Sequence, residues 1–197
     1  MKSFFIVVTY SIASFASDNL SSWLFKIEKN TAAYTVQNAF TIIEYSLFTY
    51  LVFIELQNKT IKKIIALLSV LFYFICIYNY ISTTPHFDSI NVTVESILII
   101  SYCIYFFYEQ INIPRVTFIY SSHQFWIISG ILIYLAATFF LFMQADSLSN
   151  EVRRGFWIIA ILSQIIRNLF FLIALLTQNH KDKPQKKFDN HRIYTEF

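Results

Sequence analysis

Apolar residues in this chain come in six blocks, each about as long as an α-helix must be to cross a lipid bilayer. A crossing helix needs about 20 mostly apolar residues, because the hydrocarbon core is about 30 Å thick. The blocks cover residues 4–25, 32–54, 64–81, 90–107, 124–144 and 156–177. Short polar segments separate them, so consecutive helices are expected to be antiparallel neighbours. The pattern predicts an all-α polytopic integral membrane protein, with a six-transmembrane-helix bundle over residues 1–177 and short connections.

The composition supports this fold class. Of the 197 residues, 56% are hydrophobic, 19% are aromatic and 14% are charged. A typical soluble domain has about 25% charged residues, which it needs on its surface. This chain has too few charges to cover itself in water, and an ordinary soluble domain is therefore excluded.

Basic residues are distributed unevenly along the predicted topology. With six spans both termini lie on one side, and that side carries ten basic residues against four on the other. The positive-inside rule then places both termini in the cytoplasm, with the protein in the cell (inner) membrane. The polar, basic tail, residues 178–197, is expected to contact anionic lipid headgroups, and nucleic acid is not an expected partner.

The first block has an alternative interpretation as a signal peptide. Lys2, the apolar run 4–12 and the small residues 13–16 resemble a secretory signal with an A-x-A-like cleavage site. Cleavage there would leave five spans and an external amino terminus. Apolar character resumes over residues 20–25, however, and we therefore favour an uncleaved first helix.

Four of the blocks contain one charged residue each, namely Asp18, Glu44, Glu95 and Arg167. An ionisable side chain in hydrocarbon is costly unless it is paired or hydrated, so each is a candidate functional residue. Glu44 and Arg167 lie near the centres of their spans, at equal depth. We therefore expect them to form a central buried ion pair. Polar neighbours are expected to support this pair: Gln37, Asn38, Gln164 and Asn168.

Other polar side chains are expected to lie nearer the membrane surfaces. Some could line an outer vestibule above the central pair: Asp18, Glu95, Tyr102 and Tyr134. Glu55 and Glu109 lie near the cytoplasmic ends of their spans, where a solvated rim of charge is expected. Tyr10 is assigned to the aromatic belt that membrane proteins place at the lipid–water interface.

No pattern in the chain indicates a metal, a cofactor or a catalytic group. All lysines lie outside the spans and all histidines lie outside or at their edges, which disfavours a retinal-type Schiff base and bis-His haem. HExxH and GxSxG motifs are absent. Cys76 and Cys103 lack CxxC spacing and are expected to be buried as small apolar groups. No cofactor is expected, and an enzyme is disfavoured.

Several polar and aromatic residues recur inside the spans: Asn38, Glu44, Tyr45, Phe125, Trp126 and Tyr134. In this compact multi-pass layout, the chain is similar to the membrane-sensing regions that precede some bacterial histidine kinases. It is also similar to small bacterial inner-membrane proteins. The likeness is one of layout and not of a diagnostic motif, so it assigns no family.

Three functions remain open. The leading hypothesis is a non-enzymatic sensing or scaffolding module with a buried polar core. It would act through a membrane or cytoplasmic protein partner, or as a homo-oligomer, because the sequence contains no output domain. The alternative is a small secondary transporter or channel for an ion, a proton or a small solute. The third is an intramembrane lipid-modifying enzyme, which would need a polar cavity open to one leaflet.

Overall fold

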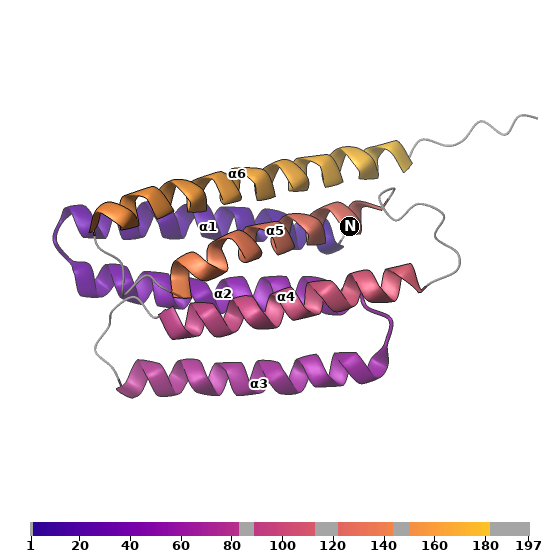
Figure 1. Cartoon of the computed structure of the whole chain (residues 1–197), viewed down its shortest axis with the longest axis horizontal. Coiled ribbons are helices and arrows are strands. Elements are labelled where there is room, and N and C mark those ends of the chain that lie inside the picture. The colour runs from indigo at the N-terminus through magenta and orange to yellow at the C-terminus, as the bar shows by residue number, and fades with distance from the viewer. Residues whose placement is uncertain (1, 83–88, 113–121, 144–149, 182–197) are drawn as a thin grey trace, which may run out of the picture.

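The chain folds into α-helices that lie roughly side by side (Figure 1). A computed structural model describes residues 2–82, 89–112, 122–143 and 150–181. Its helices are α1 (Lys2–Lys26), α2 (Asn30–Glu55), α3 (Lys59–Ser82), α4 (Ser89–Ile111), α5 (His123–Met143) and α6 (Asn150–Lys181). The all-helical prediction is confirmed, and each helix overlaps one of the six apolar blocks. Within the tail predicted from residue 178, residues 182–197 lie outside the described part.

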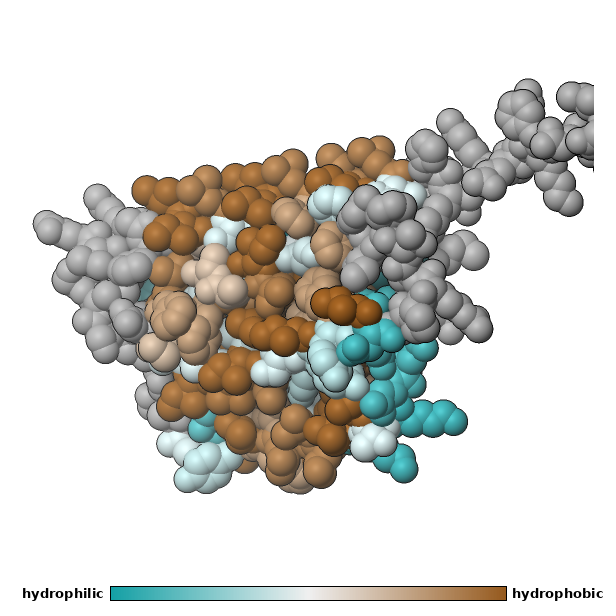
Figure 2. Space-filling model, turned by 45° about the vertical axis from the view of Figure 1, so that its right-hand side comes forward, coloured by the Kyte–Doolittle hydropathy of each residue, from teal (hydrophilic) through white to brown (hydrophobic). Residues whose placement is uncertain are grey.

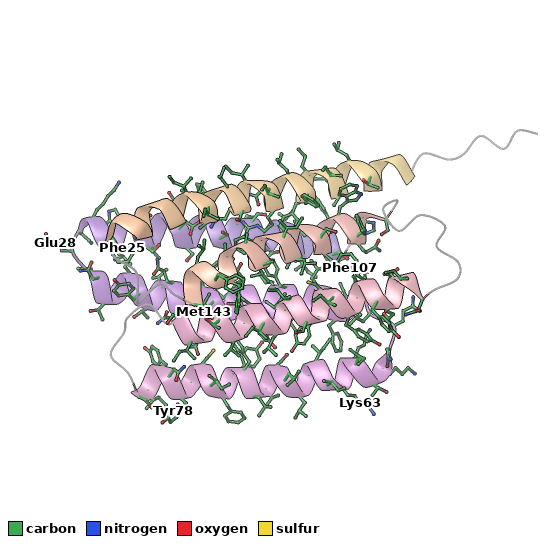
Figure 3. The ribbon with its side chains drawn as sticks, in the orientation of Figure 1. Phe25, Glu28, Lys63, Tyr78, Phe107 and Met143 are labelled. Atoms are coloured by element: carbon green, nitrogen blue, oxygen red, sulfur yellow. The ribbon has the colours of Figure 1, made fainter. Side chains whose placement is uncertain are left out.

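The helices pack in a chain of neighbours. Helix α1 packs on α2, α2 on α4, α4 on α5, and α5 on α6. Helix α3 contacts α2 and α4 and lies at one edge of the bundle, opposite α6 (Figure 1). Phe107 illustrates the inward packing, because it points from α4 towards α5 and its ring centroid lies 5.7 Å from that of Phe125 (Figure 3).

Four stretches of the described helices are long and apolar enough to cross a membrane: Lys59–Ser82, Ser89–Ile111, His123–Leu141 and Ile158–Thr177. The prediction of six spans is therefore not confirmed. Helices α1 and α2 are long enough, but polar residues lower their hydropathy. Examples are Asp18 and Asn19 in α1, and Gln37 and Asn38 in α2. Four apolar helices are consistent with a membrane location.

The outward face of the bundle is largely apolar. Figure 2 shows hydrophobic residues over most of the face in view, with hydrophilic residues gathered mainly at the right-hand end. Even α1 has large apolar side chains on its outer side, and Phe5 and Phe15 are each 72% exposed. Apolar exposure on this scale is expected where a protein contacts lipid tails rather than water.

Gly130 allows α5 and α6 to approach closely. A Cβ atom at this position would lie 2.8 Å from Cβ of Phe170 and 3.3 Å from the carbonyl oxygen of Arg167. Both distances are too short for ordinary packing, so the contact requires glycine or a shift of α6. Small residues allow close helix approach in membrane bundles, and here the approach occurs at the level of Arg167.

Hydroxyl and amide groups attach α3 to the rest of the bundle. Hydrogen bonds link Tyr45 Oη with Ser69 Oγ (2.9 Å), Ser46 Oγ with Tyr73 Oη (2.9 Å), and Asn79 Nδ2 with Asn91 Oδ1 (2.8 Å). Tyr45 Oη also lies 3.4 Å from Tyr102 Oη, which links α2 with α4. Such bonds between helices stabilise packing where lipid and core are equally apolar.

Candidate functional site

Five buried side chains, one from each helix except α3, form what we call the central polar cluster: Tyr10 (α1), Glu44 (α2), Glu95 (α4), Tyr134 (α5) and Arg167 (α6). None of them is more than 8% exposed. Burying ionisable groups is costly unless they are paired, and they are therefore the strongest candidates for function. The cluster contains one basic and two acidic side chains.

The hydroxyl group of Tyr10 joins Glu44 to Arg167. It donates a hydrogen bond of 2.7 Å to Oε1 of Glu44 and accepts one from Nη1 of Arg167. Both bonds involve a charged group, and such bonds are stronger than those between neutral groups. The two charges that the sequence suggested as partners thus lie in one place, connected through a phenol group from a third helix.

The guanidinium group of Arg167 also contacts two aromatic rings. Its Cζ atom lies 4.8 Å from the ring centroid of Tyr10 and 4.4 Å from that of Tyr134. These are cation–π distances, and such contacts are strongest when the cation is removed from water. Tyr134 follows Gly130 by one helical turn, so the close approach at Gly130 brings this ring to Arg167.

Glu95 has a different environment within the cluster. It is 2% exposed, and among the described residues its buried Oε1 atom has no hydrogen-bond partner. Its carboxyl group interacts electrostatically with that of Glu44, the acceptor of the Tyr10 hydrogen bond. A buried carboxyl oxygen without a partner is uncommon, and it requires a structural or functional explanation.

The residues expected to support the pair lie at different distances from it. Asn168 accepts hydrogen bonds of 3.4 Å from Nε and Nη2 of Arg167, although its side chain is exposed. Gln37, Asn38 and Gln164 are half-buried. The side-chain hydrogen bonds found between described residues do not link Gln37 or Gln164 with the pair.

The four residues expected to line an outer vestibule occupy three environments. Glu95 and Tyr134 belong to the central polar cluster. Tyr102 is buried and contacts Tyr45 on the side of α3. Asp18 is exposed on α1, two turns beyond Tyr10.

The assignment of Tyr10 to the interfacial aromatic belt is wrong. This residue is 1% exposed, and its ring centroid lies 4.4 Å from that of Phe48 and 6.4 Å from that of Phe171. Its place could have been suspected from its depth, because it lies eight residues, or more than two turns, inside a helix of 25 residues that begins at Lys2. Aromatic belts occur at the ends of spans.

The carboxyl groups expected in a solvated rim also have specific contacts. Glu109 accepts hydrogen bonds from the backbone N–H groups of Gln57 and Asn58, both of 2.8 Å, and thereby fixes the α2–α3 turn against α4. Glu55 accepts a hydrogen bond from the hydroxyl group of Ser3 on α1. Glu109 therefore stabilises the α2–α3 turn, and Glu55 stabilises the contact of α1 with α2.

Metal and thiol chemistry find little support in the described residues. Within them, no group of three or more His, Cys, Asp and Glu side chains is placed to hold a metal ion. Cys76 and Cys103 are both buried, as expected for small apolar groups.

Comparisons of this chain with protein-family models, with curated proteins and with solved structures find no match. Function must therefore be inferred from the central polar cluster itself.

Proposed function

We propose that this protein is a six-span membrane module that senses a ligand and passes the signal to a protein partner. The observation that carries this proposal is the Tyr10 bridge, which ties α1, α2 and α6 together through a single hydroxyl group. Because the two hydrogen bonds share this hydroxyl group, a movement of Tyr10 would break both of them together. That is the behaviour expected of an element with two states.

Glu95 is the second carboxyl group of the cluster. Arg167 is the one cation of the cluster and contacts Glu44 through Tyr10, while Oε1 of Glu95 has no hydrogen-bond partner among the described residues. A ligand that moves α1 or α6 would break the contact between Arg167 and Glu44 that Tyr10 provides. The expected result is a shift of helices relative to one another, which a partner can detect at the cytoplasmic end.

Six spans follow if α1 and α2 are inserted with the other four helices. The apolar outer face of α1 and its bond to Arg167, in the middle of an apolar helix, support this. The positive-inside rule then favours cytoplasmic termini in the cell (inner) membrane.

Cysteine labelling tests this topology. Lys29, in the α1–α2 turn, and Lys63, at the start of α3, are both exposed, and we expect them on opposite sides of the membrane. With the two native cysteines replaced, a membrane-impermeant maleimide should label Lys29→Cys in intact cells. Lys63→Cys should react only after permeabilisation. Equal labelling of both positions from one side would show that α2 does not cross, and the six-span topology would be refuted.

A capture experiment tests the sensing function. The full chain is cross-linked in its own membranes, purified, and compared with Tyr10→Phe and with Tyr78→Phe, which changes an exposed tyrosine on α3 (Figure 3). We expect a stoichiometric partner, another protein or a second copy, with the wild type and Tyr78→Phe. Its recovery should change several-fold with Tyr10→Phe. Failure to recover any stoichiometric protein would remove the main support for this function.

The unpaired oxygen of Glu95 favours a second candidate, a small carrier of protons or cations. Buried carboxyl groups near the bilayer centre are typical of proton relays and ion paths. Purified protein in liposomes should then move protons or a monovalent cation, and Glu95→Gln should abolish this movement while the protein stays folded. Absence of transport over a broad panel of ions and solutes would leave the sensing module as the better proposal.

A further inference from the structure

We propose that a groove between α1 and α6 binds one acyl chain of an anionic phospholipid, and that this lipid is the ligand of the sensing module. The groove lies along the first half of α1 and the last turns of α6, two helices that are adjacent in Figure 1. The second part of the proposal rests on the sensing function proposed above, whereas the first part does not depend on it.

The lining of the groove suits a hydrocarbon chain. It has a volume of about 440 Å³ and its lining side chains are apolar except for Ser11, among them Phe4, Val7, Val8, Phe15 and Phe171. The hydroxyl group of Ser11 already donates a hydrogen bond of 2.9 Å to the carbonyl oxygen of Val7. Water or a polar solute would find few partners in this groove, since a polar group needs hydrogen bonds when it leaves water.

The length of the groove matches one leaflet. From Phe4 to Phe15 the axis of α1 rises about 17 Å, at about 1.5 Å per residue. This is about half of a hydrocarbon core that is about 30 Å thick. An acyl chain extends from its headgroup to the bilayer midplane and would fill a groove of this length. A transmembrane helix of a partner crosses both leaflets, and a longer groove would be expected for it.

The two helices that form the groove have basic residues at the helix ends next to it, which suits an acidic headgroup. Helix α1 begins at Lys2 and α6 ends at Lys181, both at the same end of the bundle (Figure 1). The groove begins two residues after Lys2 and ends six residues before Lys181. Basic residues at the membrane surface attract anionic lipids.

The inner end of the groove reaches the Tyr10 bridge. Phe171 lines the groove, and its ring lies edge-on to that of Tyr10, with 6.4 Å between the centroids. Val7 and Ser11, which flank Tyr10 on α1, line the groove as well. An acyl chain in the groove would therefore pack against Phe171 and so hold the ring of Tyr10 in place. Loss of the chain would leave Tyr10, which joins Glu44 to Arg167, freer to move.

Photo-cross-linking in native membranes identifies the occupant. A benzophenone amino acid replaces Val8, which is 40% exposed and lines the groove, or Val70 of α3, which is 50% exposed and lies outside it. At Val8 we expect adducts of acidic phospholipids, enriched at least three-fold over the composition of the membrane. At Val70 the adducts should match that composition. Capture of a second copy or of another protein at Val8, or adducts of average lipid composition there, would overturn the proposal.

A binding experiment separates the groove from the sensing function. The full chain is reconstituted in nanodiscs with equal amounts of phosphatidylglycerol and phosphatidylcholine, and the lipids that remain bound after extraction are counted by native mass spectrometry. Val8→Trp should reduce bound phosphatidylglycerol at least three-fold, whereas Val70→Trp should not change it. Equal retention by the two variants overturns the groove. If Val8→Trp removes the lipid but partner recovery is unchanged, the lipid is not the ligand. If lipid binding fails while Tyr10→Phe still changes partner recovery, the sensing function stands with another ligand.

Discussion

Replacing Tyr10 by Phe removes one oxygen atom from the middle of the bundle and leaves the ring in place. The aromatic contact with Phe48 and the cation–π contact with Arg167 remain available to phenylalanine. Two hydrogen bonds are lost, one to Oε1 of Glu44 and one from Nη1 of Arg167. Each charged group then loses a partner in a buried site, 8% exposed for Glu44 and 3% for Arg167.

The expected loss of unfolding free energy follows from these two bonds. Hydrogen bonds to charged groups contribute about 1.5–3 kcal/mol each in soluble proteins. Side-chain hydrogen bonds between helices in a membrane average about 0.6 kcal/mol, with a maximum near 1.7 kcal/mol, because the unfolded state in lipid finds other partners. With both bonds lost together, we expect Tyr10→Phe to destabilise the bundle by about 1–3 kcal/mol.

Steric trapping or denaturant unfolding in bicelles measures this difference. The matched control is Tyr78→Phe, which removes the same oxygen from a side chain that is 70% exposed on α3. This control should stay within about 0.5 kcal/mol of the wild type, as is usual for surface substitutions. If the two variants have the same unfolding free energy, the Tyr10 bridge contributes nothing and our account of the cluster is refuted.

Three further predictions concern the same helices. Arg167→Met should destabilise the bundle, and adding Glu44→Gln should recover part of the loss, because a buried charge without its partner costs more than a neutral pair. Gly130→Ala should destabilise it by about 1–3 kcal/mol through overpacking against Phe170, measured by unfolding in bicelles. Glu109→Gln should speed amide exchange in the α2–α3 turn several-fold, because glutamine retains one of the two acceptor oxygens.

Each of these predictions has an outcome that contradicts it. Additive losses for Glu44→Gln and Arg167→Met would mean that the two side chains are not coupled. A more stable Gly130→Ala would mean that helix propensity, which favours Ala by about 1 kcal/mol, outweighs the close contact with α6. The exposed Glu28→Gln variant is the control for Glu109→Gln. If amide hydrogen exchange at Gln57 and Asn58 is the same in both variants, Glu109 does not stabilise the α2–α3 turn.

The positions of the helices could be predicted from the sequence because lipid-facing and buried residues are both apolar. Each span then appears as one continuous apolar block, bounded by polar turns. The same property hides which side of a helix faces inward. On α1, Ile6 and Val7 are buried while Phe5 and Ile12 are exposed, and hydropathy does not distinguish the two pairs.

The charged members of the cluster could be identified for a related reason. Glu44, Glu95 and Arg167 stand out because charge is rare inside apolar blocks and costly in hydrocarbon. Their common depth brought Glu44 and Arg167 together as candidates. Depth gives the position of a residue along the helix axis but not the direction in which its side chain points from that axis. It therefore could not show that Tyr10 lies between Glu44 and Arg167.

The sequence by itself thus determined an all-helical chain with apolar, membrane-length segments and a few charged residues inside them. Only the tertiary structure decided that Tyr10 connects Glu44 with Arg167, that Gly130 brings Tyr134 against Arg167, and that α1 and α6 leave a groove open beside the bridge. The physical reason is that these features depend on the rotation of each helix about its axis. Rotation is set by side-chain packing between helices, which leaves no periodic signal when lipid and core are equally apolar.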